Sequence, residues 1–350
     1  MRLLRRLALA ALALALLLAL AVAIWWFLPA RTPSISGERA VAKLERVELG
    51  GHAHTVLTRG SDTRNPALLF LHGGPGAAFL PAARYYSDQL EEHFVVVHVD
   101  QRGAGASCPG VDWDRLTLEQ AVRDAIELSE RLARNSGPNA KIFLLGHSWG
   151  SVVGALAAQR RPELYHAYIG LGQVVDGRRN EELSFQWVIE EARRRGDVDA
   201  LAELETLEPP YDEIAELMAQ RRWLSRYNGS LYEPDRAWRA LIPLLFAPEY
   251  TLATRLGWLD CFVSSVHAMW GEFDKLDFPK QIPKLEVPVY FFTGRHDWNT
   301  PYPLVEEWAA TLDAPRVEVV WFEDAGHMIP FSSPAAFQRA LIDRLRPLAP

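Results

Sequence analysis

Cysteine is scarce in this sequence, which holds only Cys108 and Cys261 among its 350 residues. A disulfide framework or a cysteine-based metal site needs more sulfur ligands than these, at closer spacing. We therefore expect two free or buried thiols, and a single disulfide between them is the alternative in an oxidising compartment. Neither a metal nor a cofactor is expected.

Lysine and arginine are fewer than aspartate and glutamate, 37 against 44. The net charge is −7 at pH 7, and neither a lysine- or arginine-rich run nor an internal repeat stands out. A chain that binds nucleic acid or a broad anionic surface carries the opposite balance of charge. Nucleic acid is therefore excluded as a partner, and the sequence is silent on oligomeric state. The hydrophobic fraction of 49% is that of a globular, core-forming chain.

The N-terminal segment 1–28 has three arginines among its first six residues and then runs without charge from Leu7 to Leu28. A run of about 20 apolar residues can cross the hydrocarbon core as a helix. Because the arginines favour the cytoplasmic side, we predict an uncleaved, single-pass signal anchor with the rest of the chain on the extracytoplasmic side. The alternative is a signal peptide cleaved at Ala21-Val22-Ala23, which would secrete the remainder.

Short apolar runs alternate with helical patterns along much of the chain. Runs of this kind, apolar on both faces, indicate a parallel sheet covered by helices on both sides. An alternating segment with a Gly50-Gly51 turn, residues 41–57, predicts a hairpin in front of them. The expected strands cover residues 67–71, 94–99, 141–145, 167–172, 287–294 and 317–322, and the expected helices cover 82–92, 116–135, 151–158 and 334–345.

The pattern changes after about residue 174, where the chain becomes helical, charged and rich in tryptophan up to about residue 278. We therefore predict a helical cap over residues 174–284, inserted between two parts of an α/β core, 41–173 and 285–350. Residues 29–40, with proline, threonine, serine and glycine, are expected to form a linker.

The motif Gly146-His147-Ser148-Trp149-Gly150 stands between a predicted strand and a predicted helix. This is the G-x-S-x-G pattern of a nucleophile elbow, in which a sharp turn exposes a serine at the edge of the sheet. The flanking glycines leave room for the turn, and the helix start points backbone N–H groups at the site. Ser148 is the predicted nucleophile, and His147 is expected to pack beneath the elbow.

A serine nucleophile needs a base, and the base needs an acid that orients it. In the α/β-hydrolase order these follow the serine as Asp or Glu and then His, each after a strand. We assign Asp297 as the acid and His327 as the base. Asp324 is closer to His327 in sequence, but it is expected to shape the turn, and His296 is expected to be a structural or pocket residue.

The negative charge that develops on a carbonyl oxygen needs two N–H donors. One is expected to be the backbone of Trp149, directly after the nucleophile. The other is expected in the loop His72-Gly73-Gly74-Pro75-Gly76, where glycines let the backbone approach a substrate. We choose Gly74 as this donor, with Gly73 as the alternative.

Together, the motifs His72-Gly73-Gly74-Pro75-Gly76, Asp100-Gln101-Arg102-Gly103 and Gly146-His147-Ser148-Trp149-Gly150 resemble those of the proline iminopeptidase (prolyl aminopeptidase) family of α/β-hydrolases. The resemblance covers residues 41–172 and 287–345. It implies a serine peptidase that removes an N-terminal residue, preferably proline, from short peptides through an acyl-enzyme beneath a helical cap.

The resemblance is weaker in the predicted cap and at Ala77, where the family usually has a further glycine. In that family, cap carboxylates bind the free amino end of the substrate, but no motif assigns this role to a position in this chain, so the substrate-binding residues stay unassigned. Asp100 and Arg102 are expected to form a buried ion pair that braces the loops. The available cap glutamates are Glu181, Glu182, Glu190, Glu191, Glu233 and Glu272.

Two interpretations of function remain open. The first is the aminopeptidase, and the second is an esterase or amidase that acts on small acyl substrates with the same residues; dependence on a free amine separates them. A binding protein with a decayed hydrolase fold is disfavoured because every catalytic position is filled. An epoxide hydrolase or dehalogenase would have a carboxylate where Ser148 stands.

Overall fold

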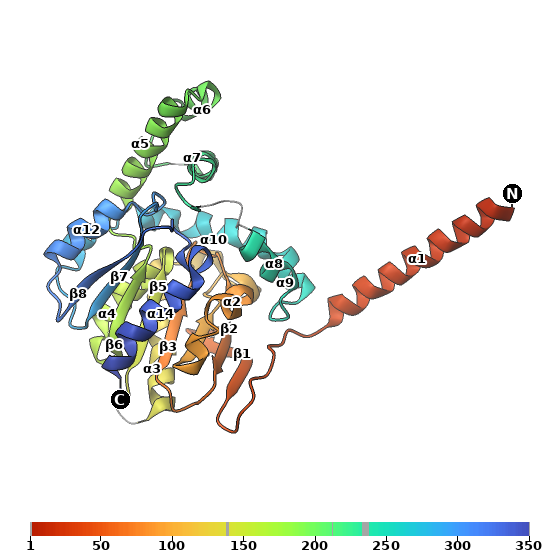
Figure 1. Cartoon of the computed structure of the whole chain (residues 1–350), viewed down its shortest axis with the longest axis horizontal. Helices are drawn as coiled ribbons and strands as arrows, with labels where there is room; N and C mark the ends of the chain where they lie inside the picture. The colour runs from red at the N-terminus through yellow and green to blue at the C-terminus, as the bar shows by residue number, and fades with distance from the viewer. Residues whose placement is uncertain (1, 138–139, 212, 233–237, 350) are drawn as a thin grey trace.

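The computed structural model describes residues 2–137, 140–211, 213–232 and 238–349. A single sheet of eight strands forms its centre, in the order β1-β2-β4-β3-β5-β6-β7-β8 (Figure 1). The strands are β1 (Val41–Leu49), β2 (His52–Gly60), β3 (Ala67–Leu71), β4 (Val95–Val99), β5 (Ile142–His147), β6 (Tyr165–Leu171), β7 (Val289–Gly294) and β8 (Val317–Phe322).

Most of this sheet is parallel. The hairpin β1–β2 and the pair β2–β4 are antiparallel, and all pairs from β4 to β8 are parallel. The predicted hairpin and mostly parallel sheet are therefore confirmed. Because parallel strands end at the same edge, the loops that follow β3, β4, β5, β7 and β8 meet on one side of the molecule.

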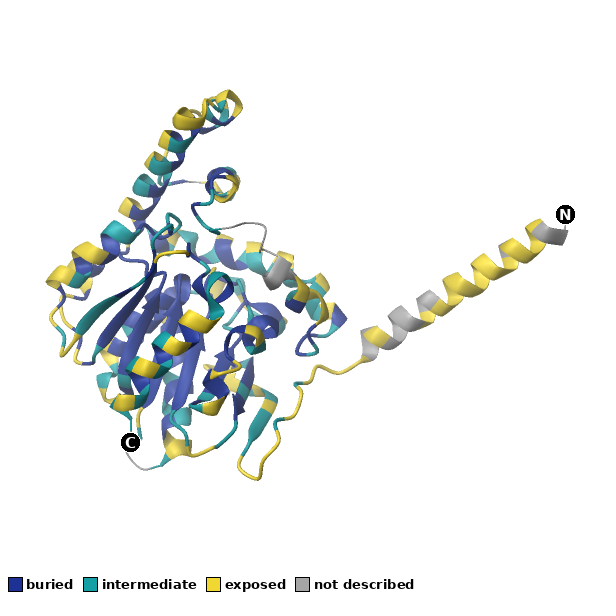
Figure 2. Ribbon diagram, viewed as in Figure 1, coloured by how far each residue is buried: buried dark blue, intermediate teal, exposed yellow. Residues whose placement is uncertain are grey.

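Helices cover both faces of the sheet, and the strands are buried between them (Figures 1 and 2). Alternate residues of each strand point to opposite faces, so Leu144 of β5 packs with α3 and α4, whereas Leu145 packs in a second core that includes α14. The core helices are α2 (Ala83–Tyr86), α3 (Leu118–Ser136), α4 (Trp149–Arg160), α12 (Tyr302–Thr311), α13 (Ile329–Ser332) and α14 (Pro334–Leu345).

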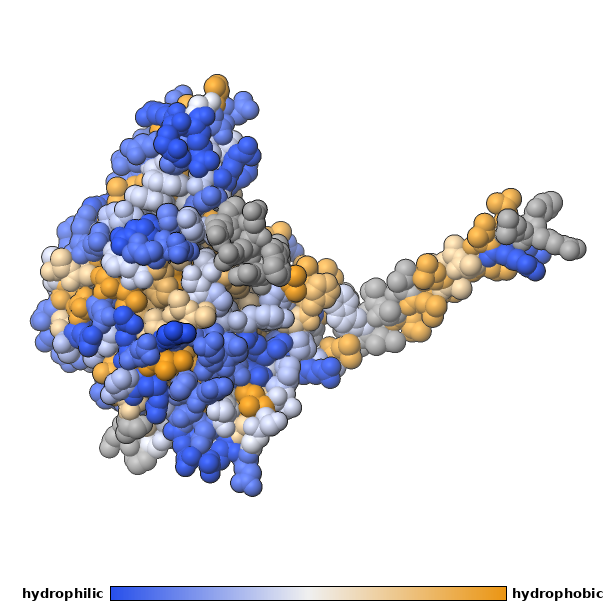
Figure 3. Space-filling view, viewed as in Figure 1, coloured by the Kyte–Doolittle hydropathy of each residue, from blue (hydrophilic) through white to orange (hydrophobic). Residues whose placement is uncertain are grey.

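The chain between β6 and β7 forms helices above the edge where the parallel strands end (Figure 1). The outermost of them, α5 and α6, present a mostly hydrophilic surface (Figure 3). Helices are thus observed where the sequence predicts them, and the division into cap and core stays a prediction. These helices are α5 (Gly177–Arg195), α6 (Val198–Leu204), α7 (Ile214–Arg226), α8 (Trp238–Phe246), α9 (Leu252–Leu256), α10 (Trp258–Phe273) and α11 (Phe278–Gln281).

The helix predicted over residues 82–92 is broken into short pieces. Only α2 is α-helical, and short 3₁₀ turns lie on either side of it. The side-chain oxygen of Gln338 on α14 accepts hydrogen bonds from the backbone N–H groups of Gln89 and Leu90, at 2.8 and 3.3 Å. A continuous helix would use these N–H groups internally, so a tertiary contact has replaced a local one.

The predicted membrane anchor is wrong. Residues Arg2–Phe27 do form a helix, α1, which extends away from the rest of the chain (Figure 1). Among the residues that the structure describes, however, no helix offers an apolar stretch long enough to span a bilayer. The extracytoplasmic placement that depended on the anchor is overturned with it.

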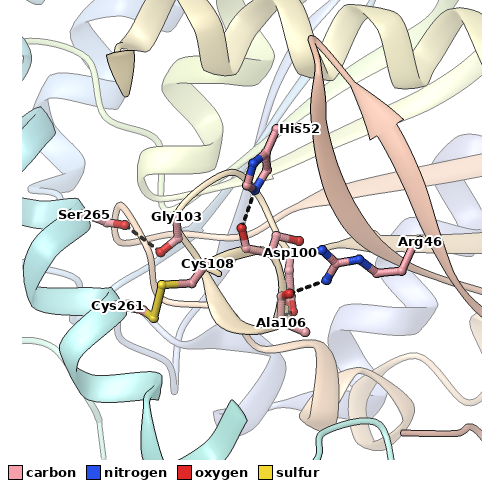
Figure 4. Close-up of a disulfide and its surroundings, with 9 residues drawn as sticks. Arg46, His52, Asp100, Gly103, Ala106, Cys108, Cys261 and Ser265 are labelled. Atoms are coloured by element: carbon pink, nitrogen blue, oxygen red, sulfur yellow. Dashed lines mark hydrogen bonds between the residues drawn. A yellow bond between two sulfur atoms is a disulfide. The ribbon is translucent and has the colours of Figure 1, made fainter. Parts of the chain in front are cut away.

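The expectation of free thiols is also wrong, because Cys108 and Cys261 form a disulfide (Figure 4). The bond joins the loop after β4 to α10, over a sequence separation of 153 residues. Close to it, the Ser265 hydroxyl on α10 donates a hydrogen bond of 2.8 Å to the carbonyl of Gly103. Sequence spacing could not reveal this pair, since only the folded chain brings α10 against the loop.

The expected ion pair between Asp100 and Arg102 is not formed. The Arg102 guanidinium donates to Asp124 on α3, at 2.8 Å, instead. Asp100 is fully buried, and its carboxyl group accepts hydrogen bonds of 2.8 Å from the Tyr250 hydroxyl and the Ala106 N–H. Burial raises the pKa of Asp100 to about 7. The two side chains thus brace the loop separately.

Removing the disulfide should lower stability. A crosslink that closes a loop of this length restricts the unfolded chain, which typically contributes about 2–4 kcal/mol. We expect the double variant Cys108→Ser, Cys261→Ser to lose about this much free energy of unfolding in urea titrations followed by circular dichroism. Thiol titration of the unreduced, denatured wild type should find no free thiol, and two free thiols would contradict the bond.

Stability should also depend on pH through His98 of β4, whose side chain is buried against the rings of Phe70 and Tyr86. Burial lowers the pKa of His98 to about 3, from 6.5. Because the unfolded chain binds a proton here below about pH 6.5 and the folded chain does not, the contribution of His98 to stability is lost as pH falls.

The variant His98→Phe should therefore lose less stability than the wild type between pH 6 and pH 4, by about 1.4 kcal/mol per pH unit. Urea titrations at several pH values measure this difference. Parallel pH curves for the two proteins would contradict a buried neutral histidine.

Candidate active site

Ser148 lies in a turn between β5 and α4, where the sequence predicts the elbow. Its backbone has φ 52° and ψ −120°, a region that residues other than glycine rarely adopt. Neighbouring groups hold this conformation: the Ser148 N–H donates to the carbonyl of Leu171 on β6 at 2.9 Å, and the Ser151 hydroxyl donates to the Ser148 carbonyl at 2.6 Å. Strain of this kind is typical of functional sites.

The two glycines of the motif are required by close backbone contacts. A side chain at Gly146 would collide with the carbonyl of Gly150, and one at Gly150 would collide with the carbonyl of Leu71 on β3. The elbow therefore packs directly against the end of the neighbouring strand.

The predicted acid and base meet at the ends of β7 and β8. Asp297 and His327 are both buried, and Nδ1 of His327 lies 2.8 Å from Oδ2 of Asp297. The Asp297 carboxylate also accepts hydrogen bonds from the N–H of Asn299, the N–H of Thr300 and the hydroxyl of Thr300, at 3.0, 2.9 and 2.8 Å. Since the carboxylate only accepts, Nδ1 carries the proton and Nε2 is left as the basic nitrogen.

The alternatives to these residues do not contact the Asp297–His327 pair as an acid or base would. Asp324 is exposed in the turn before His327. His296 stacks on the ring of Tyr232, with 3.9 Å between the ring centroids. His147 is buried under the elbow, where its Nε2 lies 3.1 Å from the carbonyl oxygen of His327, and burial lowers its pKa to about 3. The geometry thus favours Asp297 over Asp324 as the partner of His327.

A cavity of about 280 Å³ opens between the end of the sheet and the helices above it. It brings together Ser148, His327, Gly73, Gly74 and Trp149, which all line it. Helix α10 contributes an apolar wall. The side chains of that wall are Phe262, Val266, Trp270 and Phe273.

The predicted oxyanion donors face this cavity. Gly74 has φ +122°, a conformation that favours glycine. A Cβ atom on Gly73 would lie 2.9 Å from the Cβ of Ser148, so a side chain there would crowd Ser148. Within the described parts of the chain, neither the N–H of Gly74 nor that of Trp149 donates to a protein acceptor, so both can bind a substrate oxygen.

A buried histidine explains why the loops after β3 and β4 carry paired motifs. His72 accepts a hydrogen bond from the Gln101 N–H at Nε2, at 3.0 Å, and therefore donates from Nδ1 to the Gly73 carbonyl, at 2.8 Å. The Gln101 side chain donates back to the carbonyl of His72 at 2.7 Å. Burial lowers the pKa of His72 to about 4, which keeps this arrangement neutral.

The cap glutamates do not form a wall of the cavity. Glu181 is fully buried, Glu190 is exposed, and none of those described is among the lining residues. Glu191 pairs with Arg194 and Arg195, and Glu272 pairs with Lys275. Glu182 is half-buried, and Glu233 lies outside the described residues.

Sequence reasoning missed three residues of the site: Thr300, Asn180 and Arg221. Thr300 holds Asp297, and its place three residues after an aspartate is a signal for such a local bond. Asn180 and Arg221 line the cavity from α5 and α7, and no motif marks them. Among the described residues, no group of three or more His, Cys, Asp or Glu side chains could hold a metal ion.

Comparisons with known proteins agree with this geometry. A probable aminopeptidase of Bacillus subtilis is 27% identical over 88% of this chain and 97% of its own length. A probable proline iminopeptidase of Leptolyngbya boryana is 25% identical over 90% of this chain and 94% of its own. The crystal structure of proline iminopeptidase from Mycobacterium smegmatis superposes with a TM-score of 0.65 over 87% of this chain and 98% of that one. At 18% identity, it supports the fold alone.

These relatives confirm the resemblance to the proline iminopeptidase group. The model of the alpha/beta hydrolase family matches residues 68–340, which include all the proposed catalytic positions. The chain is a hydrolase and belongs to the alpha/beta hydrolase family.

Proposed function

We propose that this chain is a serine aminopeptidase that removes the N-terminal residue, preferably proline, from short peptides. The main support is one arrangement: a strained Ser148 shares a cavity with His327, whose Nδ1 is bonded to a buried Asp297. The named relatives and the paired loop motifs support the peptide substrate.

In the proposed reaction, Oγ of Ser148 attacks the carbonyl carbon of the first peptide bond while Nε2 of His327 takes the hydroxyl proton. Asp297 stabilises the imidazolium, and the N–H groups of Gly74 and Trp149 stabilise the oxyanion. His327 then gives the proton to the leaving amine, so the C–N bond breaks and an acyl-enzyme remains. A water molecule then attacks the acyl-enzyme carbonyl while Nε2 of His327 takes its proton. The proton passes to Oγ of Ser148 as the ester bond breaks, which releases the amino acid.

The prolyl ring fits the apolar side of the cavity. Aromatic side chains of α10, among them Phe262 and Trp270, offer flat surfaces against which a compact ring can pack. A volume of about 280 Å³ suits a small substrate, since ligand pockets begin at roughly 300 Å³.

An esterase or amidase is the second candidate, and one observation favours it. None of the described cap glutamates lines the cavity, so the group expected to bind a free amino end is not on its wall. An ester or amide of a small acid needs no such group.

We expect Ser148→Ala and His327→Ala to lower kcat by roughly 10⁴- to 10⁶-fold, without additivity in the double variant. Asp297→Asn should lower kcat by roughly 10⁴-fold because the neutral amide favours the wrong tautomer of His327. Asp324→Asn is the matched control, and it should leave kcat within about twofold because its side chain is exposed. If Asp324→Asn is inactive and Asp297→Asn is not, the proposed acid is wrong.

The substrate class is tested by steady-state kinetics on prolyl-p-nitroanilide, its N-blocked counterpart and a short-chain p-nitrophenyl ester. An aminopeptidase should cleave the first, lose most activity on the second, and lose all of it in Ser148→Ala. Equal rates on blocked and free substrates would exclude an aminopeptidase, and activity on the ester alone would favour the second candidate.

A further inference from the structure

We propose that Arg221 is an anion-binding residue of the active-site cavity and selects substrates that carry a free carboxylate near the scissile bond, such as prolyl dipeptides. The inference deepens the proposed function and rests on it, because Ser148 is taken as the reacting centre. Arg221 lies outside the sequence motifs and is not one of the predicted catalytic residues.

Arg221 lies on α7 and lines the same cavity as Ser148 and His327. Among the described lining residues, it is the only Asp, Glu, Lys or Arg. Its side chain is 19% exposed, so the guanidinium is mostly removed from bulk water. Its charge is balanced by the buried Glu181, so a ligand here would be held by the N–H donors of the guanidinium and not by a net positive charge.

Buried partners hold the guanidinium in place. Nη2 donates to Oε1 of Glu181 at 2.6 Å, and Nη1 donates to the side-chain oxygen of Gln220. Glu181 and Gln220 are fully buried, and the amide of Gln220 donates in turn to the Ser184 hydroxyl at 3.0 Å. An arginine fixed in this way loses little conformational freedom when a ligand binds.

Some N–H groups of the Arg221 guanidinium are not used by these two partners. Arginine has five N–H groups in a planar fork, and in the described structure its bonded acceptors are those of Glu181 and Gln220. The remaining N–H groups can bind a carboxylate, which matches the spacing of the fork.

Glu181 itself is poorly placed to bind the substrate. It is fully buried and does not line the cavity. Its Oε1 accepts from Arg221 and from the Asn180 amide, and its Oε2 is buried with no hydrogen-bond partner among the described residues. The cap therefore presents the cation of the pair to the cavity and keeps the carboxylate behind it.

The support of Arg221 is continuous with that of the proposed acid. The Asn180 amide donates to Glu181 and to the carbonyl of Asn299, both at 3.0 Å, and the Asn299 N–H donates to Asp297. This chain of hydrogen bonds sets the position of the guanidinium relative to the loop that orients His327. A bound carboxylate is thus held in a fixed relation to the reacting centre.

The test compares two substrates that differ only in charge, prolyl-glycine and prolyl-glycinamide, by the rate of proline release. We expect wild-type kcat/KM to be roughly 10- to 100-fold higher for the free carboxylate, as for other hydrogen bonds between charged groups. Arg221→Gln should lose this preference by slowing prolyl-glycine while leaving prolyl-glycinamide within about threefold. Arg221→Lys keeps the charge without the fork and should retain part of the preference.

Arg222→Gln is the matched control, because Arg222 is the next residue on α7 but is exposed and pairs with Glu203. It should change neither substrate. Equal wild-type rates on the two substrates would overturn the proposal. The proposal would also be overturned if Arg221→Gln and Arg221→Lys lowered kcat/KM equally for prolyl-glycine and prolyl-glycinamide, because that result would indicate a structural role for Arg221.

Failure of the proposed function gives a different result. In that case neither prolyl substrate is cleaved, and the same variants are measured on p-nitrophenyl butyrate and on mono-p-nitrophenyl glutarate, which has a terminal carboxylate. A loss in Arg221→Gln confined to the glutarate supports the anion site, and equal effects on both esters overturn it.

Discussion

The backbone of Ser148 is the constraint on which the rest of the site depends. A residue with a side chain holds a positive φ only when its surroundings constrain it, and the groups around Ser148 come from β3, β6 and α4. The carbonyl of Leu171 on β6 accepts a hydrogen bond from the Ser148 N–H, and the carbonyl of Leu71 on β3 lies against Gly150. The hydroxyl of Ser151 donates a hydrogen bond to the Ser148 carbonyl, which fixes the turn from the other side. The sheet therefore positions Ser148, the proposed nucleophile, and the loops are arranged around it.

The other loops share this dependence on the sheet. Asp297 and His327 follow adjacent parallel strands, so their side chains meet at one edge although 30 residues separate them. The loops after β3 and β4 are joined through His72 and Gln101, which is why two motifs that are distant in sequence occur as a pair. Each loop is thus positioned twice, by the strand before it and by a polar contact with its neighbour.

Local patterns were enough to predict the strands, the elbow and the partners at the strand ends, because each depends on residues close in sequence. Contacts that depend on the completed fold were out of reach. Nothing near Arg102 points to Asp124, nothing near Gln89 points to Gln338, and no spacing rule pairs Cys108 with Cys261.

The disulfide has a consequence for how ligands reach the cavity. It fixes α10 to the core loop, and the Ser265 hydroxyl is bonded to Gly103 beside it (Figure 4). The Tyr250 hydroxyl is bonded to Asp100 in the same loop. Helix α10 is therefore tethered to the core loop, and its separation from this loop would break a covalent bond. Movement of α10 away from the core loop is limited to what the crosslink allows, whereas no disulfide restricts α5 and α7 within the described structure.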